Sequence, residues 1–72
     1  MPMRVEISDR SLLAELVDAL NGSGCRVDRT TARTCHVVHP LAASENEALL
    51  EVAFFVRAWQ LGHPGVAATV RA

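Results

Sequence analysis

The sequence contains no lysine, and its seven basic residues are balanced by eight acidic residues to a formal net charge of −1. A chain with so little net charge builds no strong field toward a polyanion, which argues against a basic nucleic-acid-binding peptide. Half of the residues are apolar and 21% are charged, which excludes a disordered tail and a collagen-like fibre. We therefore expect a soluble globular protein.

Long apolar runs are missing as well. The longest, Val52–Val56, is far shorter than the ~20 residues that a membrane span needs. Residues 1–9 contain no apolar run, so no secretory signal is predicted. The two cysteines, Cys25 and Cys35, are fewer than small disulfide-stabilised secreted scaffolds usually carry. These absences predict a cytoplasmic protein with reduced thiols and no membrane partner.

The length of 72 residues leaves room for one hydrophobic core, so we expect a single domain over residues 1–72. Alternating apolar and polar residues predict four strands, at residues 3–7, 25–30, 34–39 and 66–70. Apolar residues at helical spacing predict two helices, over about 9–21 and 44–61, the second opened by a capping box of Ser44 and Glu47. The β-α-β-β-α-β order predicts an α+β, ferredoxin-like sandwich, with two helices on one face of a four-stranded antiparallel sheet.

The second predicted helix has two apolar sides. The side expected to face the core carries Leu49, Val52, Ala53, Val56 and Trp59. Leu50, Phe54 and Leu61 form a second stripe more than a quarter-turn away. This stripe either packs against the first helix or forms an interface, because contiguous exposed apolar patches usually mark interfaces. The small core and an unpaired sheet edge add to the expectation of a homo-oligomer, in the simplest case a homodimer, or of binding to another protein.

One cluster holds residue types that suit zinc or copper: Cys25, Cys35, His36 and His39. On a strand, however, residues 36 and 39 point to opposite faces. A hairpin that turns around Ala32 places Cys25 across from His39 and Cys35 across from Arg29, which keeps the two sulfurs apart. We therefore predict no metal, no other cofactor and buried thiols. A Cys25–His39 pair lacks any sequence signal for an orienting group or an oxyanion site, so no enzyme is predicted.

Open sheets of this kind often bind single-stranded RNA through exposed aromatic residues on their strands. Here Phe54, Phe55 and Trp59 all lie on the second predicted helix. The outward strand positions are instead polar: Arg4, Glu6, Arg26, Asp28, His36, Thr69 and Arg71. No nucleic-acid partner is expected, and RNA binding is a remote alternative.

Three segments together resemble the small regulatory ACT domains: Ser8–Val17, Gly24–Val27 and His63–Val70. The resemblance implies the β-α-β-β-α-β order, binding of amino acids or similar small ligands, and pairing through strands or helices. The family's ligand loop joins the first strand to the first helix, so the resemblance assigns ligand binding to Asp9, Arg10 and Ser11. The expected function is a small stand-alone protein-interaction module that self-associates. The alternative is an ACT-like module that senses an amino acid or another small carboxylate ligand and acts in trans.

Overall fold

The computed structural model describes residues 3–72, so residues 1–2 of the expected single domain lie outside the described part. The elements follow in the order β1 (Met3–Ile7), the short 3₁₀ helix η1 (Arg10–Leu12), α1 (Leu13–Gly22), β2 (Arg26–Arg29), β3 (Thr34–Val38), α2 (Glu45–Leu61) and β4 (Ala68–Arg71). Within residues 3–72, no helix is both long and apolar enough to cross a membrane.

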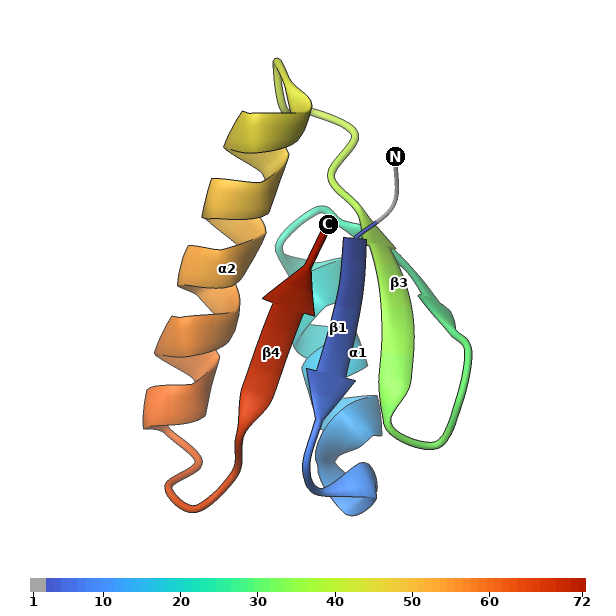
Figure 1. Cartoon of the computed structure of the whole chain (residues 1–72), viewed down its shortest axis with the longest axis vertical. Helices are drawn as coiled ribbons and strands as arrows, with labels where there is room; N and C mark the ends of the chain where they lie inside the picture. Colours follow the sequence, from blue (N-terminus) through green and yellow to red (C-terminus); the bar gives the residue numbers. More distant parts are fainter. Residues whose placement is uncertain (1–2) are drawn as a thin grey trace.

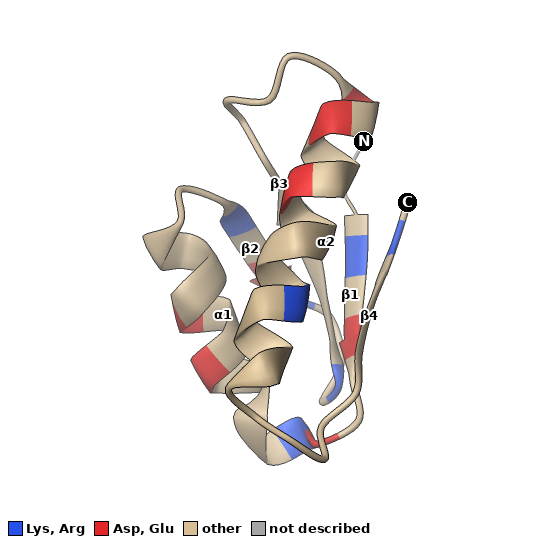
Figure 2. Ribbon diagram, turned by 90° about the vertical axis from the view of Figure 1, so that its left-hand side faces the viewer, with Lys and Arg blue, Asp and Glu red and all other residues tan. Residues whose placement is uncertain are grey.

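The four strands form one sheet in the order β2-β3-β1-β4, with every neighbouring pair antiparallel. In Figure 1 the sheet lies beside α2 and in front of α1, and the side view in Figure 2 shows both helices on the same side of it. The predicted α+β class, with a four-stranded antiparallel sheet and two helices, is therefore confirmed. The expected hairpin register is also confirmed, because Arg29 pairs with Cys35 across β2 and β3.

The core lies between the sheet and the helices. In β1, Met3, Val5 and Ile7 are buried while Arg4 and Glu6 are exposed, as the period-two pattern predicts. Both thiols are buried, also as predicted. The buried core set is Met3, Val5, Ile7, Leu13, Leu16, Leu20, Cys25, Cys35, Val37, Val52 and Val56.

The first helix begins later than the sequence predicts. Asp9 caps η1, and α1 starts only at Leu13, because the Asp9 carboxylate and carbonyl accept the Ser11 and Leu12 amides and close a tighter turn first. The left-handed residue expected at Asn21-Gly22 is instead Gly24, with φ +96°. Ser23 makes this possible, because its hydroxyl donates to the Leu20 carbonyl at 2.8 Å and prolongs the helix end.

The second helix begins as predicted, but only one of the two hydrogen bonds of the capping box forms among the described residues. The Ser44 hydroxyl accepts the Glu47 amide at 3.1 Å. No return bond from the Glu47 carboxylate to the Ser44 amide occurs among the hydrogen bonds of residues 3–72. The last strand is shifted from the expected 66–70 to Ala68–Arg71, because His63–Gly65 form a turn in which the Val66 amide donates to the His63 carbonyl.

Candidate interaction surface

Three of the five exposed large hydrophobic residues in the described part of the chain lie on the outer side of α2. Leu50, Phe54 and Leu61 are 71%, 77% and 80% exposed, whereas Val52 and Val56 on the opposite side of the helix are 1% exposed. The alternative that this stripe packs against α1 is therefore wrong. The reason is spatial: α1 lies over β2 and α2 over β4, and these strands are opposite edges of the sheet.

A groove of about 780 Å³ runs between this side of α2 and the β4 edge. Its walls include all three residues of the stripe together with Val66 and Val70. Because β4 pairs only with β1 in the described part of the chain, its outer edge has unpaired backbone groups next to the apolar stripe. Apolar contact area and a strand edge are thus available on the same side of the molecule.

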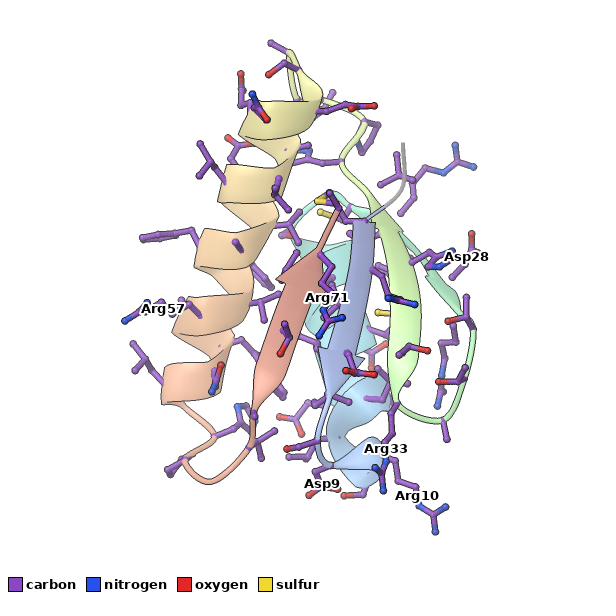
Figure 3. All side chains as sticks on the ribbon, viewed as in Figure 1. Asp9, Arg10, Asp28, Arg33, Arg57 and Arg71 are labelled. Carbon is purple, nitrogen blue, oxygen red and sulfur yellow. The ribbon has the colours of Figure 1, made fainter. Side chains whose placement is uncertain are left out.

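Two charged residues accompany the stripe on α2: Glu47 precedes Leu50, and Arg57 lies between Phe54 and Leu61. Glu47 and Arg57 are both exposed, and Figure 2 shows acidic residues along the first half of the helix and a basic one in the second half. In Figure 3, Arg57 points away from the sheet, on the outer side of α2. The first half of this helix surface is therefore acidic, and its second half carries one basic residue.

A second pocket, of about 460 Å³, lies on the other flank of α2 and is lined by Cys25, His39 and Glu51 among others. The His39 Nε2 atom is 2.6 Å from the Glu51 Oε2 atom, while the buried Nδ1 atom has no hydrogen-bond partner within residues 3–72. The Cys25 Sγ atom lies 3.7 Å from the Ser23 hydroxyl oxygen. Glu51 was missed at the sequence level, because nothing local connects it to His39. Within residues 3–72, no hydrogen bond joins this thiol to the imidazole, and no three His, Cys, Asp or Glu side chains gather as metal ligands.

In the predicted ligand loop of Asp9, Arg10 and Ser11, the Asp9 carboxylate accepts the loop's own hydrogen bonds. Asp9 Oδ1 accepts bonds from the Ser11 amide at 3.0 Å and from the Ser11 hydroxyl at 2.6 Å. These two bonds, followed by the charge of Arg33, hold the pKa of Asp9 below its usual value. Figure 3 shows Arg10 extending into solvent beside Arg33. The Ser11 donors that a carboxylate ligand would use are thus engaged by Asp9.

The open face of the sheet is polar, as predicted. The strand registers place Asp28, His36, Arg4 and Arg71 in one row across the sheet. All four are exposed, and Arg71 projects from this face in Figure 3. The adjacent Arg4 and Arg71 carry like charges directly opposite each other, which is mildly destabilising in a sheet. The row mixes charges and contains no aromatic side chain for stacking on a base.

The fold and this surface together describe a small α+β domain with one exposed apolar helix side. Comparisons with protein-family models, with curated proteins and with solved structures found no match.

Proposed function

We propose that the protein is a protein-interaction module that self-associates through the exposed side of α2. The observation that carries the proposal is the exposure of Leu50, Phe54 and Leu61 beside the unpaired β4 edge. Leaving three large apolar side chains in water is unfavourable, and their burial contributes roughly 1.5 to 3 kcal/mol for each side chain fully covered. A second copy of the chain presents the same apolar surface, so the two stripes can cover each other without another partner.

We further assign the chain to the ferredoxin-like group and to the cytoplasm. Support for the first comes from the sheet order β2-β3-β1-β4, in which the connections through α1 and α2 each pass over one intervening strand. Support for the second comes from two free, buried thiols, which a reducing compartment preserves.

The ACT-like alternative receives less support. It requires Asp9, Arg10 and Ser11 to hold a small carboxylate ligand, but Asp9 already accepts both Ser11 donors and places a negative charge in the loop. RNA binding likewise receives no support from the polar, non-aromatic sheet face. Interaction through α2 is thus the function that the geometry favours, and it requires no catalytic residue.

The test is a measurement of mass in solution by light scattering across roughly 10 to 500 µM protein. The wild type is expected to approach twice the 7.8 kDa chain mass, and Phe54→Glu to remain near the chain mass, because a carboxylate in the centre of the stripe opposes burial. Ala14→Glu, at an exposed position of α1, is the matched control and should leave association unchanged. A wild type that stays monomeric throughout this range would overturn the proposal.

A further inference from the structure

The exposed side of α2 carries a regular seam, which we define as Glu47, Leu50, Phe54, Arg57 and Leu61. The spacing between its members is 3, 4, 3 and 4 residues, which keeps all five on one side of α2; three of them are apolar and two are charged. All five seam residues are exposed, and their inner neighbours Val52 and Val56 are buried in the core. The seam is thus independent of the residues that hold α2 on the sheet.

We propose that two copies of the chain pair through this seam with their α2 helices antiparallel and with the two-fold axis at the level of residue 52, midway between Leu50 and Phe54. The proposal rests on the proposed function and specifies its geometry. Positions 47 and 57 are symmetric about position 52, and so are positions 50 and 54. Leu50 of each copy then faces Phe54 of the other, and Glu47 of each copy faces Arg57 of the other. Two apolar layers in the centre are enclosed by two ion pairs.

The same axis accounts for the remaining large apolar side chain near α2. Leu41 is 85% exposed in the loop before α2, and Leu61 is 80% exposed at the far end of the helix. Because the helices are antiparallel, the loop of one copy lies at the helix end of the other, so Leu41 and Leu61 meet at both ends of the interface. Every exposed large hydrophobic of this region therefore receives an apolar partner.

Other pairings of the seam leave charges unmatched. A parallel pairing sets Glu47 against Glu47 and Arg57 against Arg57. A second antiparallel pairing has its axis between residues 55 and 56, so that Leu50 of each copy faces Leu61 of the other. In this pairing the Arg57 side chains of the two copies lie close to the axis and to each other, and no carboxylate of the seam lies between them. Like charges at such short range disfavour both arrangements.

Charge reversal tests the register directly. Glu47→Arg and Arg57→Glu are each expected to raise the dimer dissociation constant about 10-fold or more at low salt, because each converts two attractive contacts into repulsive ones. The double variant Glu47→Arg/Arg57→Glu restores both pairs and should dimerise like the wild type. An equimolar mixture of the two single variants should form heterodimers, and these effects should shrink at roughly 1 M salt. Circular dichroism of each variant verifies that α2 remains folded.

Cysteine cross-linking provides a second measurement that does not depend on charge. Under mild oxidation, a mixture of Glu47→Cys and Arg57→Cys should give a disulfide-linked dimer, and neither variant alone should do so efficiently. The native thiols do not compete, because Cys25 and Cys35 are only 8% and 0% exposed.

The outcomes separate the register from the function. If Phe54→Glu abolishes dimerisation but charge reversal has no effect and no 47–57 cross-link forms, the interaction surface stands and the antiparallel register is overturned. If Arg57→Cys cross-links to itself, the second antiparallel pairing or the parallel pairing replaces it. If the wild type never dimerises, the proposed function itself fails.

Discussion

Glu15 and His63 are separated by 48 residues in the chain, yet the His63 Nε2 atom lies 2.9 Å from the Glu15 Oε1 atom. The His63 Nδ1 atom lies 2.9 Å from the Trp59 carbonyl oxygen, and the imidazole stacks on the Trp59 ring with 4.0 Å between centroids. Both ring nitrogens thus face acceptors, and only the protonated imidazole donates to both. His63 thereby connects α1 to the end of α2.

This contact predicts a pH-dependent stability. The Trp59 carbonyl, and then the Glu15 carboxylate, raise the pKa of His63 above its ordinary value of 6.5. A raised folded-state pKa contributes stability that is fully present below the unfolded-state pKa and is lost as the pH rises through the folded-state pKa. We expect the free energy of unfolding to fall as the pH rises above about 6.5, and NMR titration of the imidazole to give a pKa above that value. Glu15→Gln should lower this pKa, while Asp18→Asn, elsewhere on α1, should leave it unchanged. A His63 pKa at or below 6.5 would contradict the assignment.

The core is small enough for one truncation to unfold the protein. Leu16 is fully buried between α1 and the sheet. Leu16→Ala should cost about 2 to 5 kcal/mol, which is comparable to the whole stability of so small a domain. Circular dichroism should therefore show a largely unfolded chain at 25 °C. Asp18→Ala, at an exposed position of the same helix, should change stability by less than about 0.5 kcal/mol. A cooperative melt of Leu16→Ala close to that of the wild type would show that the core is less dependent on α1 than the packing implies.

The start of α2 depends on one side-chain bond. Ser44→Ala removes the acceptor for the Glu47 amide and should cost about 0.5 to 2 kcal/mol in thermal or urea unfolding. Glu47→Gln should cost much less, because the Glu47 carboxylate makes no return bond to the Ser44 amide among the described residues. Equal losses from the two substitutions would instead favour a complete capping box in solution.

The loop before α1 provides a test of the sensing alternative. Because Asp9 engages both Ser11 donors, we expect no change in the backbone NMR signals of residues 8–13 when the twenty amino acids or common carboxylate metabolites are added at millimolar concentration. Arg10→Ala is the companion variant. Signal shifts that occur in the wild type and disappear in Arg10→Ala would favour ligand sensing over protein interaction as the function.

The order of the elements and the register of the hairpin follow from local sequence patterns. Strand alternation in Met3–Ile7 and helical spacing in Leu13–Leu20 are local patterns, because the period of burial follows from the backbone geometry of a single element. Arg29 and Cys35 were placed opposite each other by counting from the turn. The start of α1 was predicted too early, and the left-handed residue was expected at Asn21-Gly22 rather than at Gly24. Both depend on hydrogen bonds of Ser11 and Ser23 that compete with helix propagation.

The exposure of the second apolar stripe of α2 and the contacts between distant residues depend on how the elements pack. The sequence predicted correctly that Val52 and Val56 face the core, but no local pattern indicates whether the second stripe, with Leu50 and Phe54, packs against α1 or stays exposed. Its exposure follows from the position of α1 over the opposite edge of the sheet, which leaves the outer side of α2 without a neighbouring element among the described residues. The contacts of His63 with Glu15 and of His39 with Glu51 arise in the same way, because the packing of whole elements brings together residues that carry no local signal of each other.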